Sequence, residues 1–258
     1  MCLIAFAFAP GTRVPLRLAA NRDEFHARPA APLASWTDAP DIVGGRDLEA
    51  GGTWLAVHRR GRVAAVTNVR DPALKVPADA PSRGRLVRDA LECDDLSAWL
   101  ERLAAGEGWR YAGFNLLAGD GERLWHLHRG RGQLLLTPVA PGTHGLSNAS
   151  LDTPWPKLIR VRQALQHALA PPHWPVRMLE ALGDTAIADD AHLPDTGVGL
   201  ALERQLSAPF ILGEHYGTRA MTWLEWDAEA RRVHLGERRF GPEGVSLGES
   251  ELSVALRA

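Results

Sequence analysis

The first 24 residues are the part of the chain that most limits how it can fold. Two apolar runs, 3–8 and 14–20, flank the turn residues Pro10-Gly11-Thr12, which is typical of a β-hairpin. The second run ends in the polar quartet Asn21-Arg22-Asp23-Glu24. Because a hairpin returns the end of its second strand to the start of its first, we expect this quartet to lie beside Cys2.

Cys2 stands directly behind the initiator methionine. Removal of Met1 would leave a thiol and an α-amine on one residue. An α-amine with a pKa of about 7.7–8.0 can take up the thiol proton directly or through one water, so nucleophile and base would share a residue. The alternative is a buried strand cysteine, because free cysteine is among the most buried residue types. Position alone leaves both open.

The composition is that of an ordinary globular protein. With 258 residues, 45% of them hydrophobic, the chain can bury a substantial core. Its 29 basic and 31 acidic residues form no block of one sign, which argues against nucleic acid or an anionic membrane surface as the main partner. Two cysteines predict no disulfide framework and a cytoplasmic protein. No apolar run approaches the roughly 20 residues of a membrane-spanning helix.

The rest of the chain alternates between strand and helix signals. Strands are predicted over 53–57, 63–68, 114–117, 123–128, 133–138, 210–212, 219–226 and 232–235, and helices over 82–91, 96–105, 156–169 and 176–182. Residues 183–199 are acidic and aperiodic, which indicates a loop that could act as a lid. The order β, α, β, α, β without an evident linker favours one α+β domain over 1–258, layered rather than doubly wound.

The side chains of the polar quartet 21–24 could position the α-amine of Cys2. Along a strand, Asn21 and Asp23 share one face while Arg22 and Glu24 share the other. A carboxylate and an amide directed at the amine of Cys2 would hold it in position. The alternative is a turn closed by Asx hydrogen bonds and a surface ion pair.

Two polar residues later in the chain are further candidates for the site around Cys2. Asn148 ends a strand just before a helix, where its amide could donate to a developing oxyanion or simply terminate the strand. Arg219 follows Gly217 on a late strand and could clamp a carboxylate or a phosphate, or only pair with surface acids.

Three other motifs predict no separate site. Residues 244–248 match the GxSxG nucleophile elbow, but no histidine follows them, and that motif requires the order Ser, acid, His. His126 and His128 alternate on a strand without a third metal ligand at a recognised spacing, so we expect a structural role and no metal. The glycines of 44–47 and 51–52 lack the sequence of a phosphate-binding loop and are interpreted as turns near the site.

Six short segments, spread over nearly the whole chain, carry a family resemblance. They are Met1-Cys2-Leu3-Ile4, Asn21-Arg22-Asp23-Glu24-Phe25 with Arg28-Pro29, Gly45-Arg46-Asp47-Leu48 with Gly51-Gly52-Thr53-Trp54-Leu55, Gly113-Phe114-Asn115-Leu116-Leu117, Gly145-Leu146-Ser147-Asn148 with Leu151-Asp152-Thr153-Pro154-Trp155-Pro156-Lys157, and Tyr216-Gly217-Thr218-Arg219. In this order they resemble the NRDE family, also called the transport and Golgi organization protein 2 family.

The resemblance implies an N-terminal-nucleophile hydrolase-like fold, a four-layer αββα sandwich of two antiparallel sheets flanked by helices. Cys2 then corresponds to the nucleophile of cysteine acylases such as bile salt hydrolases and penicillin V acylases. Asp23 corresponds to the aspartate that holds their α-amine, Asn148 to their oxyanion-hole asparagine and Arg219 to their late-strand arginine. Ala20 stands where those acylases carry an arginine, in an R-N-x-D pattern, which leaves the substrate class open.

Two functions follow as hypotheses. The first is a cysteine N-terminal-nucleophile amidohydrolase that cleaves a small amide or thioester without a cofactor, with substrate bound by Asn21, Arg22, Arg46 and Asn68. The second is a binding or trafficking protein that holds haem or an acyl-lipid in the same cleft without turnover, because the family is linked to haem handling and acyl-lipid metabolism. The nine tryptophans suit an apolar ligand pocket, although tryptophan is more often core. The oligomeric state stays open.

Overall fold

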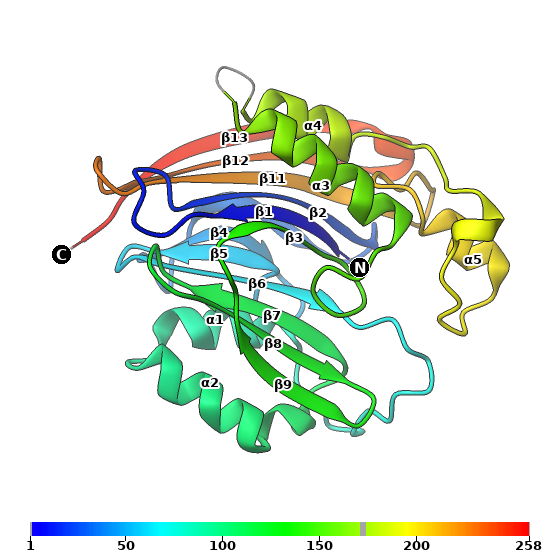
Figure 1. Cartoon of the computed structure of the whole chain (residues 1–258), viewed down its shortest axis with the longest axis horizontal. Coiled ribbons are helices and arrows are strands. Elements are labelled where there is room, and N and C mark those ends of the chain that lie inside the picture. The colour runs from blue at the N-terminus through cyan, green and yellow to red at the C-terminus, as the bar shows by residue number, and fades with distance from the viewer. Residues whose placement is uncertain (1, 171–173, 258) are drawn as a thin grey trace.

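The computed structural model describes residues 2–170 and 174–257, and it consists of two antiparallel β-sheets stacked between two layers of helices (Figure 1). This arrangement confirms the predicted α+β, four-layer sandwich. Met1, whose removal the sequence hypothesis requires, lies outside the described residues.

The first sheet has six strands in the order β10-β1-β2-β11-β12-β13. Its strands are β1 (Cys2–Phe8), β2 (Leu16–Phe25), β10 (Gly142–Leu146), β11 (Tyr216–Asp227), β12 (Arg232–Phe240) and β13 (Ser246–Ala255). The predicted hairpin is present as β1 and β2, with Cys2 opposite Arg22. On the other side of β1, Ile4 lies opposite Leu146, so the residues that follow β10 also reach the Cys2 end of the sheet.

The second sheet has seven strands in sequence order, from β3 to β9. They are β3 (Ala30–Ser35), β4 (Ile42–Asp47), β5 (Leu55–His58), β6 (Arg62–Asn68), β7 (Phe114–Gly119), β8 (Leu124–Gly130) and β9 (Gln133–Pro138). Every pair of neighbours is antiparallel, which short connections permit.

Helices cover the outer face of each sheet (Figure 1). The second sheet carries α1 (Gly84–Glu92) and α2 (Leu96–Ala105), whereas α3 (Pro156–Ala168) and α4 (Val176–Leu182) cover the first, and α5 (Leu200–Gln205) lies to one side. Short 3₁₀ turns occur at η1 (Glu107–Arg110), η2 (Asp190–His192) and η3 (Pro242–Gly244). In the described part of the chain, no helix has the length and apolar character needed to cross a membrane.

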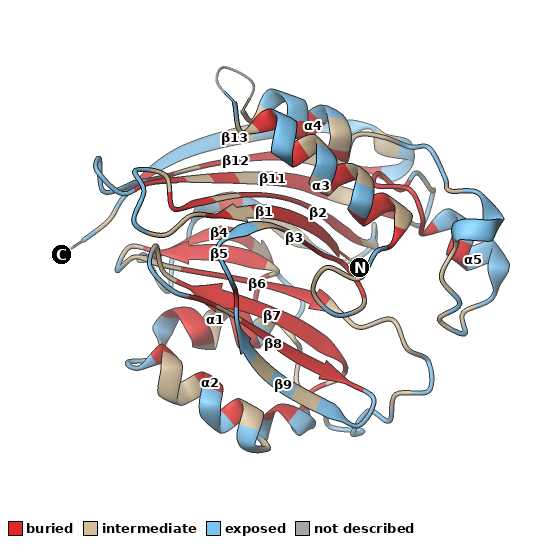
Figure 2. Ribbon diagram, viewed as in Figure 1, coloured by how far each residue is buried: buried red, intermediate tan, exposed pale blue. Residues whose placement is uncertain are grey.

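Three apolar cores follow from this layering, and Figure 2 shows the buried residues along both sheets. In β1, Ile4, Phe6 and Phe8 belong to the core between the sheets. Leu3 and Ala5 belong to the core under α3 and α4. This division follows from the two-residue period of a strand, and it sets the direction of Cys2, which shares the face of Ile4.

Several elements differ from the predictions. The glycines of 44–47 lie in β4 instead of a turn. Close packing between strands requires glycine here, since a Cβ at Gly44 would come within 2.6 Å of the Ala56 Cβ on the neighbouring strand. Residues 210–212 join no strand, and of the three only Phe210 and Ile211 are buried. Strands β3 and β13 and helix α5 were not predicted. Their sequences mix polar and apolar residues without a clear period, since most of their side chains face solvent.

Candidate active site

Cys2 begins β1 and directs its side chain into the space between the two sheets, because it shares a strand face with Ile4 and is the register partner of Arg22. The residue is only 9% exposed. Burial raises the pKa of the Cys2 thiol above its ordinary value. A thiol in this position is therefore protonated at neutral pH and needs a nearby base to act as a nucleophile.

A cavity of about 400 Å³ opens at Cys2 between the sheets. Seven of its lining residues carry ionisable acidic or basic side chains, and these come from the end of β2, the segment after it, the β4–β5 turn and the segment before α1. They are Arg22, Asp23, Glu24, Arg28, Asp47, Glu49 and Arg83. Four predicted site residues, Cys2, Arg22, Asp23 and Asn68, share this one cavity.

Arg22 is held by an aromatic ring from the second sheet. Its guanidinium lies over Trp54 at 4.6 Å from the ring centroid, and its Nη2 is 4.0 Å from Glu24 Oε2. Trp54 in turn packs on Gly45, where an added Cβ would come within 2.3 Å of the ring. The glycine therefore makes room for the tryptophan, and the tryptophan fixes the arginine at the cavity wall.

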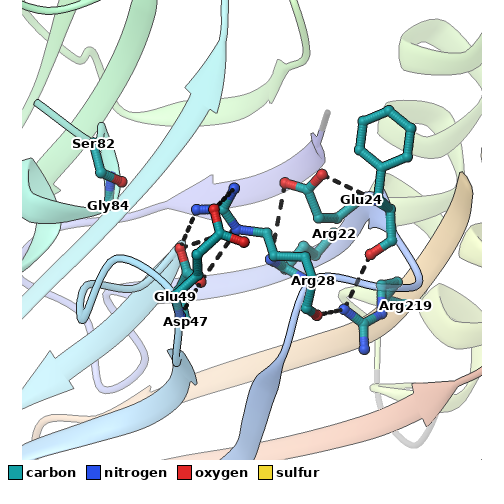
Figure 3. Close-up of polar contacts among 9 residues, drawn as sticks. Arg22, Glu24, Arg28, Asp47, Glu49, Ser82, Gly84 and Arg219 are labelled. Carbon is teal, nitrogen blue, oxygen red and sulfur yellow. Dashed lines mark hydrogen bonds and ion pairs between the residues drawn. The ribbon is translucent and has the colours of Figure 1, made fainter. Parts of the chain in front are cut away.

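An ion-pair cluster forms one rim of the cavity (Figure 3). Arg28 Nη2 lies 2.6 Å from Asp47 Oδ2, and its Nη1 lies 3.3 Å from Glu49 Oε1. Although burial opposes the change, hydrogen bonds from Arg28 lower the pKa of Asp47 below its ordinary value. Both acids of this rim are thus already matched with Arg28.

Asp23 belongs to the opposite face of β2 from Arg22, as strand alternation predicted, and still reaches the cavity. Its Oδ1 accepts a hydrogen bond of 2.7 Å from Thr218 Oγ1 on β11. Burial raises the pKa of Asp23, whereas the positive charge of Lys157 and the Thr218 bond act to lower it.

Lys157 is the cation on this buried side. It begins α3 with a side chain that is only 1% exposed, and its Nζ has no hydrogen-bond partner among the described residues. Burial lowers the pKa of Lys157 to about 8, and the carboxylate of Asp23 is the main charge that opposes this shift. The two residues therefore interact beneath the nucleophile.

Asn148 approaches Cys2 through the loop between β10 and α3. Its Nδ2 donates to the Asn68 carbonyl at 3.0 Å, and its Oδ1 accepts from Ser147 Oγ at 3.2 Å. The same Ser147 hydroxyl lies 3.2 Å from the Cys2 carbonyl. An asparagine amide has two N–H donors, so Asn148 retains one without an acceptor in the described part of the chain.

A buried hydrogen-bond network supports this loop from the second sheet. Asn115 Nδ2 donates to the Ala149 carbonyl at 2.8 Å and to Thr67 Oγ1 at 3.0 Å. Its Oδ1 bonds His126 Nε2 at 3.0 Å and His128 Nδ1 at 2.7 Å. Both imidazoles donate to one amide oxygen, which agrees with the structural role expected for them. Among the described residues, no cluster of three metal-ligating side chains occurs.

Asn148 lies behind Asn68 and does not itself line the cavity, and three further predicted residues lie away from the cavity wall. Asn21 is buried, and its Nδ2 donates to the carbonyls of Leu182 at 2.8 Å and Pro209 at 2.9 Å, so it ties β2 to the end of α4 and the loop beyond. Arg46 binds Asp38 and stacks on Trp36 at 4.4 Å, on the α1–α2 side of the second sheet.

Arg219 is the third. It stands at a bulge in β11 and donates from Nη1 to the carbonyls of Phe25 and Arg28, which fixes the segment after β2 (Figure 3). It lines a second cavity of about 60 Å³ that shares Arg22 and Trp54 with the first.

Sequence reasoning assigned no role to Lys157 or Arg83. Lys157 ends one of the segments that carry the family resemblance, and its position at the start of α3 gives no local sign of burial. Arg83 follows Ser82, whose hydroxyl accepts a hydrogen bond of 3.3 Å from the Gly84 amide where α1 begins. The predicted helix start was the available signal, but it gives no direction for the arginine side chain.

The 183–199 segment contributes no lining residue to the cavity. It leads into α5, whose Glu203 forms a buried ion pair with Arg70, with Oε2 and Nη2 2.9 Å apart. Arg70 also lies over the Trp155 ring at 4.4 Å from the centroid. These contacts attach the segment to the body of the protein next to the Asn148 loop.

The chain is similar to known proteins both in sequence and in fold. A family model described as "Transport and Golgi organisation 2" matches residues 1–242. The chain is 37% identical over 273 residues to the Transport and Golgi organization protein 2 homolog of Bos taurus, which covers 94% of this chain and 95% of the relative. The human homolog is 36% identical over 274 residues, with 97% of each chain covered.

Two solved structures share the fold. The C2A mutant of the conjugated bile acid hydrolase from Clostridium perfringens matches with a TM-score of 0.53 and 7% identity, over 97% of this chain and 92% of that one. A Caenorhabditis elegans ortholog of N-acylethanolamine-hydrolyzing acid amidase matches with a TM-score of 0.51 and 10% identity, over 86% and 92%. At these identities the likeness concerns the fold alone.

Proposed function

The chain belongs to the Transport and Golgi organisation 2 family, and from this premise and the geometry at Cys2 we propose that it is a cysteine N-terminal-nucleophile hydrolase. Its substrate is a small polar amide or thioester, and activity requires removal of Met1. One observation carries the proposal. Cys2, which would become the N-terminus, lines a charged cavity together with Arg22, Asp23 and Asn68.

The first half of the reaction forms an acyl-enzyme. The α-amine of Cys2 takes the thiol proton as sulfur forms a bond to the substrate carbonyl carbon, which overcomes the raised pKa of the buried thiol. The carbonyl oxygen becomes an oxyanion, and the unused N–H of Asn148 donates to it. The intermediate then collapses, the C–N or C–S bond breaks, and the α-ammonium gives its proton to the leaving group.

The second half releases the acid. Water attacks the thioester carbon and gives a proton to the α-amine, and the Cys2 thiol is restored when the C–S bond breaks. The role of Asp23 is to hold the α-amine in position through its carboxylate. Lys157 and Thr218 favour the ionised form of that carboxylate against the effect of burial.

The cavity lining favours a polar substrate over haem or an acyl-lipid. Among the described residues that line it, Trp54 is the only tryptophan, and none is a histidine or a methionine. Those two side chains, with cysteine thiolate, are the common protein ligands of haem iron. Seven charged residues also make the wall a poor match for an acyl chain. Cys2 is the one common haem ligand on the described part of this wall, and burial favours its protonated thiol over the thiolate that binds iron, which supports a polar substrate over haem.

Hydrolysis of short N-acyl 4-nitroanilides and short acyl thioesters tests the proposal. Wild type and Cys2→Ala should fold alike, and only wild type should turn over. Cys93→Ala is the matched control, because the second cysteine lies at the end of α1, with its thiol against Ala90 and Arg62, and should leave the rate unchanged. Equal turnover by wild type and Cys2→Ala would remove the proposed nucleophile.

A further inference from the structure

The three arginines that line the cavity differ in their partners. Arg28 is matched by Asp47 and Glu49 on the rim. Arg22 lies over the Trp54 ring with Glu24 4.0 Å away. Arg83 has no carboxylate oxygen within ion-pair distance in the described part of the chain. Among the described residues, the one hydrogen bond of its side chain runs from Nη1 to the Gly113 carbonyl at 3.2 Å.

Arg83 faces the nucleophile from the other sheet. Cys2 begins a strand of the first sheet, whereas Arg83 precedes α1, which packs on the second. Figure 3 shows Ser82 and Gly84, the residues on either side of Arg83, across the cavity from Arg22 and Arg28. Burial lowers the pKa of Arg83, and the nearby acidic groups of Cys2 and Glu24 act against this shift.

An unmatched guanidinium in such a place is a binding group. It has five N–H donors in a planar fork, one of which serves Gly113, and the fork fits the two oxygens of a carboxylate or phosphate. A partly buried cation without a counter-ion is unfavourable, and a bound anion would relieve that cost. The cavity of about 400 Å³ falls within the size of small-molecule sites, so one ligand can contact both Arg83 and Cys2.

We propose that Arg83 binds an anionic group of the substrate, a carboxylate or a phosphate, while Cys2 attacks the carbonyl at the other end of the same molecule. This inference rests on the proposed hydrolase function and narrows its substrate to an amide or thioester that carries a negative charge a few bonds from the scissile carbonyl. Arg83 is thus the residue that selects the substrate, and it takes no part in bond breaking.

Equilibrium binding tests the anion site without requiring turnover. Glutarate and propyl phosphate are titrated separately into wild type, Arg83→Met and Arg85→Met, with heat of binding as the readout. Arg85→Met is the matched control, since Arg85 lies two residues further on in the first turn of α1, is 69% exposed and is paired with Asp89. Loss of a charge-assisted hydrogen-bond pair should weaken binding about tenfold or more in Arg83→Met only. The two ligands separate a carboxylate site from a phosphate site.

Hydrolysis then tests the link to the nucleophile. Glutaryl 4-nitroanilide is compared with 5-methylhexanoyl 4-nitroanilide, and N-butyryl-β-alanine with N-butyryl-isopentylamine, because each pair exchanges a carboxylate for an isopropyl group of similar shape. Wild type should prefer the anionic member of at least one pair by about tenfold in kcat/KM, and Arg83→Met should lose that preference.

The outcomes separate the two proposals. Binding of glutarate or propyl phosphate that depends on Arg83, without cleavage of any amide, would support the anion site and contradict the hydrolase. Cleavage with no preference for the charged member of either pair, and no ligand binding lost in Arg83→Met, would overturn the inference and leave the hydrolase in place. A thermal melt of Arg83→Met close to that of wild type excludes misfolding as the cause of a loss.

Discussion

Cys2 and Arg22 are register partners on neighbouring strands, so their side chains enter the same cavity between the sheets, while Asp23, the next residue of β2, lies on the opposite face. A single hairpin therefore supplies a thiol, a cation and a carboxylate around one chain end. The turn length and the two-residue period of the strands determine this arrangement, and the cavity walls from the second sheet complete it.

The charge on Lys157 should control the pH dependence of hydrolysis through Asp23. Burial raises the pKa of Asp23, and the positive charge of Lys157 opposes that shift, so Lys157→Met should raise the pKa further. If the reaction needs ionised Asp23, the acid limb of the kcat/KM profile should move to higher pH by about one unit. Thr218→Val, which removes the 2.7 Å bond to Asp23, should move it in the same direction. An acid limb unchanged in both variants would exclude Asp23 as the titrating group.

The buried histidines should make stability depend on pH. Burial lowers the pKa of His126 from 6.5 to about 4, so the unfolded state binds a proton that the folded state does not. The free energy of unfolding should therefore fall as the pH drops from about 6.5 to about 4, by up to about 3 kcal/mol from this one group.

Urea unfolding of wild type and His126→Gln at several pH values measures this effect. The variant should lose part of the decline below pH 6.5, because glutamine can donate to Asn115 Oδ1 without titrating. Parallel stability curves for the two proteins over this range would contradict the assignment.

Gly45→Ala should disturb the cavity wall. The added methyl group would come within 2.3 Å of the Trp54 ring, and Trp54 supports Arg22. We expect a loss of about 1–3 kcal/mol in the free energy of unfolding and a raised KM. Gly121→Ala, where the nearest atom is 3.3 Å away on Pro15, is the control and should cost less and leave KM unchanged. Equal effects of the two substitutions would show that the Gly45 contact has no special importance.

The buried ion pair between Arg70 and Glu203 should contribute to the stability of the fold next to the 183–199 segment. Glu203→Gln leaves a buried guanidinium without its carboxylate, which should cost about 3–5 kcal/mol. The double variant Arg70→Met/Glu203→Leu should be more stable than Glu203→Gln, because it removes both charges. Thermal and urea unfolding of the three proteins give the comparison, and a double variant that is the least stable would contradict it.

The hairpin and most helices could be predicted because their patterns are local. The apolar runs 3–8 and 14–20 and the turn at Pro10-Gly11-Thr12 specify β1 and β2, and the polar quartet marks the end of β2 that lies beside Cys2. The solvated edge strand β13 has no such pattern, because most of its side chains are exposed on both faces. The run 210–212 has the composition of a strand but forms none, because Ile211 bonds Thr218 through one backbone and one side-chain hydrogen bond instead of a strand ladder, which no local signal reveals.

Only part of the site could be predicted, because local patterns place some of its residues and tertiary packing places the others. Cys2, Arg22, Asp23 and Asn68 meet because strand ends meet, and that follows from topology. Lys157 and Arg83 reach the site only through the path of long connections, so their burial depends on tertiary packing. Asn21 and Arg46 have polar side chains next to site residues in sequence, but the strand period turns Asn21 toward the helices and Arg46 toward Trp36.

The intact mass of the purified protein, before and shortly after mixing with a short acyl thioester, shows whether Cys2 is an N-terminal nucleophile. We expect a mass one methionine residue below that of the full sequence, followed by a species heavier by one acyl group that forms in wild type and Cys93→Ala but not in Cys2→Ala. A protein that hydrolyses the thioester while Met1 remains attached, or that carries the acyl group on Cys93, would contradict this expectation.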